Sequence, residues 1–116
     1  MIPEHASLLR LYVNGSKRWR GKALYQAVVE EIRAMGMAGA SVFLVDLSYG
    51  DHHQLRDAKS EYLFADIPVV IEAVDAPERI EELLERLRPM VMDGFATVEA
   101  VRVIRYAHHG DEPDPR

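Results

Sequence analysis

The sequence predicts an α+β protein with a ferredoxin-like βαββαβ plait, in which a four-stranded antiparallel sheet in the order 4-1-3-2 carries two helices on one face. Apolar residues alternate with period two in four segments and recur at helical spacing in two others, in that order along the chain. Both strand–helix–strand units require right-handed crossovers, which this arrangement satisfies. The 116 residues are sufficient for one domain with a hydrophobic core.

We expect the first strand over residues 8–14, because every second residue there is apolar. A basic loop with one tryptophan follows at residues 15–22. The spacing of apolar residues then predicts a helix over residues 22–35, and Gly36 is a suitable stop at its C-terminal end.

The next two strands are expected over residues 40–47 and 67–74, where apolar residues are dense. The segment that joins them includes residues 48–62, which are nearly all polar or charged. A hairpin turn of about two residues would suffice to connect two such strands. The extra length therefore needs an explanation beyond chain connection.

The second helix is expected to begin at Asp75-Ala-Pro-Glu78, which matches a capping box with proline in the first turn. An apolar stripe follows along this helix, and Gly94 ends the segment. The fourth strand is expected over residues 96–106, where apolar residues again alternate with polar ones.

Both faces of the predicted sheet carry apolar residues, although the helices would cover only one of them. Leu8 and Tyr12 lie opposite the core-facing side of the first strand, and Val70 does so on the third. Arg10 and Glu72 are isolated charges on neighbouring strands and are expected to pair across them. An apolar open face in so small a chain predicts oligomerisation through that face.

Composition narrows the functional classes. The net charge of −5 disfavours a nucleic-acid binder, and the absence of cysteine excludes disulfides and thiolate chemistry. We find neither a signal peptide nor a membrane span, and expect a cytoplasmic protein without direct membrane insertion. Residues 1–107 form the expected domain, and the polar tail 108–116 is expected to be disordered.

The sequence shows no set of residues with catalytic spacing, which indicates that the protein is not an enzyme. Asp51, His52 and His53 are metal ligands by type, but adjacent loop residues rarely converge on one ion. A tetrahedral site would need further ligands from the termini. These would be drawn from His5, His108 and His109. A solvated loop is the preferred interpretation, with His52 and His53 as the metal alternative.

The basic loop precedes the first helix, where free backbone N–H groups and the helix dipole attract anions. The candidate anion-binding residues are Lys17, Arg18 and Lys22. The alternative is a solvated basic loop with Trp19 packed on its own subunit or on a neighbour. Alternation places Arg102 and Arg105 of the fourth strand on opposite faces, so both serve one site only if a bulge intervenes.

Several runs carry a resemblance to a known family. Residues 21–25 read Gly-Lys-Ala-Leu-Tyr, and residues 36–40 read Gly-Met-Ala-Gly-Ala at the end of the first predicted helix. The later runs DIPVVIEAVDAPERIEELL and VRVIRY match as well. Over residues 8–106 the chain resembles the small bacterial and archaeal proteins of domain of unknown function 190, which are similar to the PII signalling proteins.

The resemblance implies a homotrimer of ferredoxin-like subunits that acts in signal transduction without being an enzyme. It implies that residues 48–62 correspond to the PII T-loop, which contacts partners such as a transporter, a channel or an enzyme. It also implies an adenine nucleotide effector (ATP, ADP or AMP) in a cleft between subunits. The residues then expected in the cleft are Tyr49, Gly50, Asp93, Gly94, Arg102 and Arg105.

Two alternatives remain open at this point. One is a divalent-metal-binding trimer like the cation-tolerance proteins of the same fold, with His52 and His53 as ligands. The other is a protein-interaction module without a small ligand. The chain also departs from its relatives, because residues 53–56 read His-Gln-Leu-Arg where relatives often have Ser-Arg-Ile-His.

Overall fold

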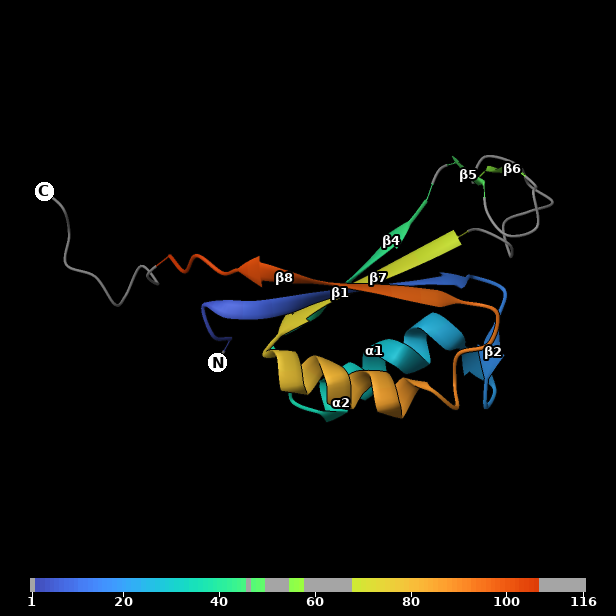
Figure 1. Cartoon of the computed structure of the whole chain (residues 1–116). Helices are drawn as coiled ribbons and strands as arrows, with labels where there is room; N and C mark the ends of the chain where they lie inside the picture. The colour runs from blue at the N-terminus through green and yellow to red at the C-terminus, as the bar shows by residue number, and fades with distance from the viewer. Residues whose placement is uncertain (1, 46, 50–54, 58–67, 107–116) are drawn as a thin grey trace, which may run out of the picture.

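The computed structural model describes residues 2–45, 47–49, 55–57 and 68–106 (Figure 1). The longer elements are β1 (His5–Asn14), α1 (Leu24–Ala34), β4 (Ala40–Leu44), β7 (Pro68–Asp75), α2 (Pro77–Leu87) and β8 (Phe95–Arg102). The shorter strands are β2 (Arg18–Trp19), β3 (Lys22–Ala23), β5 (Leu47–Tyr49) and β6 (Leu55–Asp57). The longer elements therefore follow the βαββαβ order that the periodicity predicts.

The central sheet has four antiparallel strands in the order β4-β7-β1-β8. Read from the other edge, this is the predicted order of fourth, first, third and second long strand. Figure 1 shows α1 and α2 together on one face of the sheet, with the other face open. The register places Leu9 opposite Ala73 on one side and opposite Val98 on the other.

The hydrophobic core lies between the helices and the covered face of the sheet. Leu9 of β1 and Ile71 of β7 are each 1% exposed, and they pack beneath Ile80 and Leu83 of α2, which have no exposed surface. Leu24 opens α1 in the same cluster. Because these residues recur with period two in the strands and at helical spacing in the helices, the sequence alone identifies this face.

Helix α1 begins two residues later than predicted. Lys22 and Ala23 are extended and pair with Arg18 and Trp19 in a short antiparallel ladder, so they cannot join the helix. Trp19 packs against the core of its own subunit, in agreement with the alternative interpretation of the basic loop. Gly36 follows the helix with φ of +69°, a conformation that glycine adopts without strain.

The predicted capping box at the start of α2 is wrong. Asp75 is the last residue of β7, and its Oδ1 accepts a hydrogen bond of 2.7 Å from the adjacent Ala76 N–H. Ala76 therefore occupies the N-cap position, without a side-chain cap. Pro77 opens the helix as predicted, because its missing N–H is not needed at the first helical position.

Two strands are shorter than predicted. Strand β4 ends at Leu44, and the backbone of Leu47–Tyr49 pairs instead with Leu55–Asp57 in a separate two-stranded ladder. Strand β8 ends at Arg102 and not at residue 106, because its partner β1 begins at His5, which lies opposite Arg102. Apolar alternation continues in the sequence beyond the point where a neighbouring strand is available.

Candidate functional site

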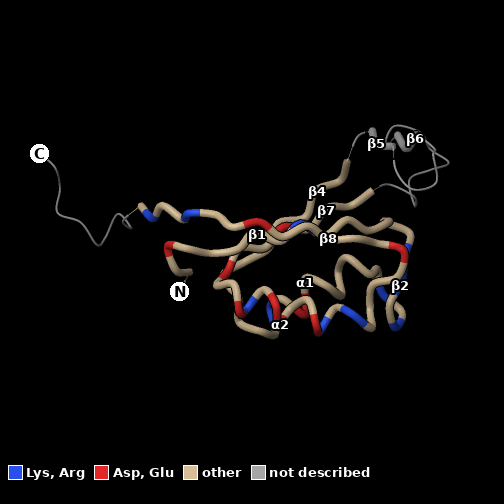
Figure 2. The backbone as a smooth tube through the Cα atoms, in the orientation of Figure 1, with Lys and Arg blue, Asp and Glu red and all other residues tan. Residues whose placement is uncertain are grey.

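Three of the predicted site residues, Lys17, Asp93 and Gly94, meet at one end of the sheet. Strands β1 and β8 are antiparallel neighbours with Tyr12 opposite Phe95, so the loop after β1 lies beside the loop before β8. Lys17 Nζ donates a hydrogen bond of 3.2 Å to Asp93 Oδ2. Figure 2 shows Lys and Arg residues gathered around β2 at this end of the molecule.

The backbone of Lys17 is fixed by the turn that ends β1. Its N–H donates to the carbonyl oxygen of Asn14 at 3.1 Å, and its own carbonyl accepts from the N–H of Leu24 at 2.8 Å. The Asn14 side chain closes the turn, because its Oδ1 accepts from both the N–H and the hydroxyl of Ser16 at 2.8 Å. These hydrogen bonds therefore fix the position of the Lys17 backbone beside β8.

The Asp93–Gly94 loop is fixed against β1 by close packing. A Cβ atom on Gly94 would lie 2.8 Å from the Tyr12 carbonyl oxygen, which is closer than van der Waals contact allows. Asp93 has φ of +60°, in the left-handed region that non-glycine residues seldom adopt. The Phe95 ring stacks on that of Tyr12 with centroids 4.6 Å apart, so both residues after Asp93 contact the same strand.

The other cations of the basic loop are directed to separate partners. Arg18 donates to the Gly21 carbonyl oxygen at 2.7 Å, and Lys22 Nζ donates to Glu30 Oε1 at 2.6 Å. The hydrogen bond from Lys22 lowers the pKa of the Glu30 carboxyl. The first helical N–H, that of Leu24, already donates to Lys17. The three cations of the predicted second anion site therefore do not converge, and of the three only Lys17 faces the Asp93–Gly94 loop.

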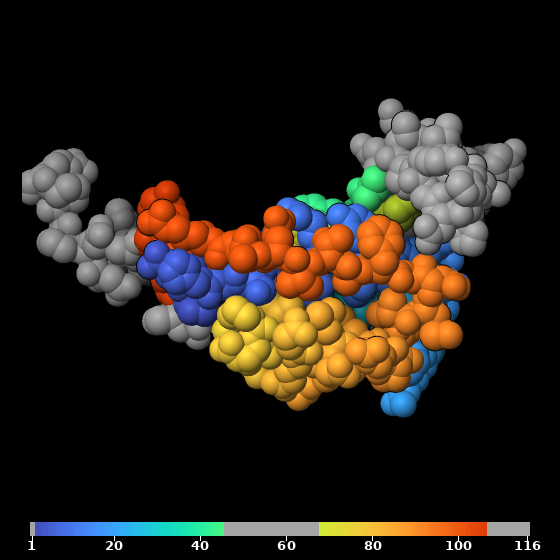
Figure 3. All heavy atoms as spheres, viewed as in Figure 1, coloured from blue at the N-terminus to red at the C-terminus, as the bar shows by residue number. Residues whose placement is uncertain are grey.

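Arg102 and Arg105 lie at the opposite end of β8 from Asp93 and Gly94. Strand β8 is eight residues long, so seven steps of about 3.3 Å place its ends roughly 23 Å apart. Figure 3 shows β8 running lengthwise above α2. Arg102 Nε donates to Glu4 Oε2 at 3.2 Å beside the N-terminus. One chain thus does not bring the predicted cleft residues together.

Several predicted residues fall where little or nothing is described. Tyr49 belongs to β5, whose backbone pairs with β6, and its backbone lies opposite Leu55. The residues that lie outside the described ranges are Gly50, Asp51, His52, His53, His108 and His109. Within the described ranges, no group of three His, Cys, Asp or Glu side chains is close enough to hold a metal ion.

The open face of the sheet carries one charged cluster among apolar side chains. Arg10 Nε donates to Glu72 Oε2 at 2.9 Å, as predicted, and its Nη1 donates to Glu99 Oε1 at 2.6 Å. The hydrogen bond to Glu72, followed by that to Glu99, raises the pKa of the Arg10 guanidinium. Phe43 and Phe95 are 48% and 55% exposed. Half-buried apolar residues of this face on the two central strands are Leu8, Tyr12, Val70 and Val74.

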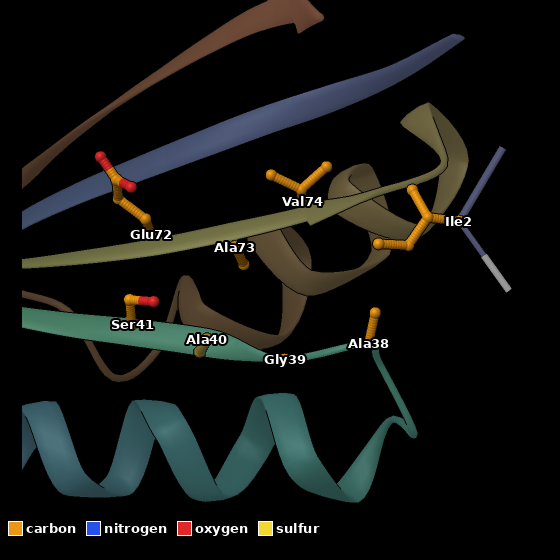
Figure 4. Close-up of a pocket in the computed structure, with 8 residues that line it drawn as sticks. All are labelled: Ile2, Ala38, Gly39, Ala40, Ser41, Glu72, Ala73 and Val74. Atoms are coloured by element: carbon orange, nitrogen blue, oxygen red, sulfur yellow. The ribbon is translucent and has the colours of Figure 1, made fainter. Parts of the chain in front are cut away.

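A shallow hollow of about 320 Å³ lies at the end of the sheet opposite the Lys17–Asp93 pair (Figure 4). Small residues of β4 and the turn before it form one wall, and the side chains of Val74 and Ile2 form the other. Glu72, which is already bonded to Arg10, lies at its rim. The predicted site residues do not line this hollow, so it is not the site that the sequence indicates.

Among the described residues, none of the helices combines the length and the apolar character needed to cross a membrane. The longest helices are α1 and α2, with 11 residues each. A span needs about 20 apolar residues in a helix.

Comparison with known sequences identifies a family and several relatives. The model of the family DUF190, described as an uncharacterized ACR, matches residues 6–103. A UPF0166 protein of Aquifex aeolicus is 33% identical over 97 residues, which cover 84% of this chain and 91% of that protein. A UPF0166 protein of Methanocaldococcus jannaschii is 26% identical over 89 residues, covering 74% of this chain and 79% of that one.

Comparison with solved structures identifies the fold. CPII, a nitrogen regulatory PII-like protein from Thiomonas intermedia K12 solved with ADP, AMP and bicarbonate, has a TM-score of 0.67 at 17% identity, over 87% of this chain and 90% of that one. A putative PII-like signaling protein from Thermus thermophilus has a TM-score of 0.67 at 19% identity, over 90% and 94% of the two chains. At such identities the likeness establishes a PII-like fold.

Proposed function

This chain belongs to the DUF190 family, and from that membership and its PII-like fold we propose that it is a non-enzymatic regulatory protein that binds an adenine nucleotide between copies of itself. The observation that carries the proposal is the separation of the predicted phosphate-binding residues. Asp93 and Gly94 lie at one end of β8, and Arg102 lies at the other. A complete site then requires a second copy to bring its arginines to the first copy's Asp93–Gly94 loop.

The open face of the sheet supports assembly of this kind. Phe43 and Phe95 are about half exposed, and four further apolar residues lie between them on β1 and β7. Covering such a surface removes apolar area from water, which is the main driving force for association. We propose that copies of the open face cover one another in a closed symmetric assembly. We propose a homotrimer because the resemblance to the PII signalling proteins implies one.

The chemistry of the site suits a phosphorylated ligand. Arginine and lysine donate charge-assisted hydrogen bonds to phosphate oxygens, and a glycine lets the backbone approach them closely. CPII was solved with ADP and AMP, which supports an adenine nucleotide as the ligand class. The residues proposed for the cleft are Tyr49, Gly50, Asp93, Gly94, Arg102 and Arg105, with Lys17, Arg18 and Lys22 of the basic loop beside it.

The segment 48–62 is proposed as the element that transmits ligand binding. Its base includes the β5–β6 ladder, which Figure 1 places at the same end of the sheet as β2. Phosphate contacts that order a loop are a well-understood physical switch. In this proposal the segment contacts a transporter, a channel or an enzyme, and the nucleotide in the cleft selects the loop conformation.

Isothermal titration calorimetry with ATP, ADP, AMP and cyclic AMP tests the proposal on the full-length protein, after its assembly state has been measured by analytical ultracentrifugation. We expect a trimer that binds at least one of these nucleotides. Arg102→Gln should weaken binding about tenfold or more, because a charged hydrogen bond to phosphate is lost. Arg86→Gln, which removes the same charge from the outer face of α2, is the control. Absence of binding by the intact assembly would overturn the proposal.

A further inference from the structure

The Lys17–Asp93 ion pair joins two loops that are each held by other contacts. The Lys17 backbone is held by Asn14 and Leu24, and Gly94 fixes the Asp93 loop against Tyr12. The fold therefore places the backbones of Lys17 and Asp93 side by side, within reach of an ion pair between their exposed side chains. The ion pair also joins Lys17 of the predicted basic-loop anion site to Asp93 of the predicted nucleotide cleft, which the sequence assigns to separate sites.

The Asp93 carboxylate occupies the Lys17 ammonium, which is the group that an anionic ligand would also contact. An ammonium group donates to a carboxylate oxygen and to a phosphate oxygen with similar geometry, so the two acceptors compete for the same donor. The side chains are 40% exposed for Lys17 and 69% exposed for Asp93, so the pair is accessible from solution. An ion pair this exposed contributes little to stability, and its exchange for another anion is correspondingly easy.

We propose that Asp93 is a selectivity residue that occupies Lys17 in the unliganded protein and must be displaced by the phosphate groups of the ligand. This inference rests on the proposed function, since it concerns the anion part of the same site. An entering anion replaces the Asp93 carboxylate as the negatively charged partner of Lys17. A monophosphate gains little by the exchange, whereas a diphosphate keeps a second charged group for the remaining donors of the site. Breaking the Lys17–Asp93 pair costs every anion the same, so Asp93 sets an affinity threshold that a diphosphate passes and a monophosphate does not.

The backbone conformation of Asp93 provides two clean substitutions. Asparagine and glycine both tolerate positive φ, so Asp93→Asn and Asp93→Gly keep the loop while removing the carboxylate charge. Lys17→Gln removes the shared donor. Glu82→Gln is the charge-matched control, because it removes one carboxylate from α2, where Glu82 accepts from Arg79 and Arg86.

The experiment measures binding of inorganic pyrophosphate, inorganic phosphate and ADP to the full-length protein and these variants by calorimetry at low salt. We expect Asp93→Asn and Asp93→Gly to tighten pyrophosphate binding about fivefold, the effect of removing one like charge from within roughly 4 Å in water. Binding of inorganic phosphate should tighten as well. Neither gain should appear when Lys17→Gln is also present or in Glu82→Gln.

The outcomes separate this inference from the proposed function. If ADP binds and both Asp93 variants bind pyrophosphate like the parent protein, the selectivity role is wrong and the regulatory function stands. If the Asp93 variants gain pyrophosphate affinity but no protein binds ADP, the selectivity role stands and the adenine-nucleotide proposal fails. If no variant binds any of the three anions, both are wrong.

Discussion

Arg10 Nε donates a hydrogen bond of 2.9 Å to Glu72 Oε2 across the two central strands of the sheet, in the middle of its open face. The same guanidinium donates to Glu99 on β8, so one cation serves two carboxylates. In the proposed assembly another copy would cover this face, withdraw the cluster from water and have to balance its net negative charge.

Substitution of Arg10 tests whether this face is an assembly surface. Arg10→Gln leaves the Glu72 and Glu99 carboxylates without a cation, and we expect the dissociation constant of the assembly to rise about tenfold or more, since an unpaired charge at an interface is costly. Sedimentation velocity over a concentration series measures this. Arg88→Gln, which breaks the exposed pair with Glu85 on α2, should leave assembly unchanged. Equal sedimentation of both variants and the parent protein would show that the open face is not the interface.

Gly94 should be intolerant of a side chain. In Gly94→Ala the new Cβ would lie 2.8 Å from the Tyr12 carbonyl oxygen, so the loop before β8 must move away from β1. We expect a loss of about 1–3 kcal/mol of unfolding free energy, in the range of overpacked sites. Urea denaturation followed by circular dichroism measures it. Gly39→Ala is the control, because no atom lies within 4 Å of a Cβ there, and an equal loss in both variants would contradict the steric account.

Leu83 and Leu84 are adjacent on α2 but differ in burial. Leu83 has no exposed surface and belongs to the core, whereas Leu84 packs against the core from its edge. Leu83→Ala should cost about 2–5 kcal/mol of unfolding free energy, since it leaves a cavity between helix and sheet. Leu84→Ala should cost clearly less. Thermal and urea unfolding of the two variants compare them, and equal costs would mean that α2 is rotated relative to this structure.

The Lys22–Glu30 pair predicts a pH dependence of stability. The hydrogen bond from Lys22 lowers the pKa of Glu30 in the folded protein. Its contribution is therefore present above the ordinary glutamate pKa of about 4.3 and is lost as the pH falls through the lowered folded value. Urea midpoints of Glu30→Gln and the parent protein should differ near neutral pH and converge in acid. A difference that stays constant down to the acid limit would rule out this pair as the cause.

The main features of the fold could be predicted from the sequence because they follow from periodicity. Leu9 and Ile71 belong to apolar faces with period two, and Ile80 and Leu83 belong to a helical stripe, so both covered faces were identifiable. The Arg10–Glu72 pair also followed, because the predicted strand order makes their strands neighbours. Element ends were less predictable, since they depend on the partner strand, as the end of β8 opposite His5 shows.

The candidate site was predictable in its residue types but not in its geometry. Lys17 and Asp93 were both identified, yet as parts of different anion sites, because 76 positions separate them in sequence. Their contact depends on the pairing of Tyr12 with Phe95, which brings the loops beside those residues together. The stack of these two rings was also missed, and the predicted neighbourhood of first and fourth strands was the signal that could have found it.

The end of β8 at Arg102, opposite the first residue of β1, has a consequence for engineering this protein. Past the end of β8, the Val103 N–H donates a 2.7 Å hydrogen bond to the Glu4 carbonyl oxygen, whereas Ile104 and Tyr106 are 55% and 89% exposed. Trimming the chain after Val103 should therefore spare the thermal midpoint of the subunit while deleting Arg105. In the proposed assembly Arg105 lies in the segment just past the end of β8, so a stop codon after Val103 would remove its contact with a neighbouring copy and leave the folded subunit intact.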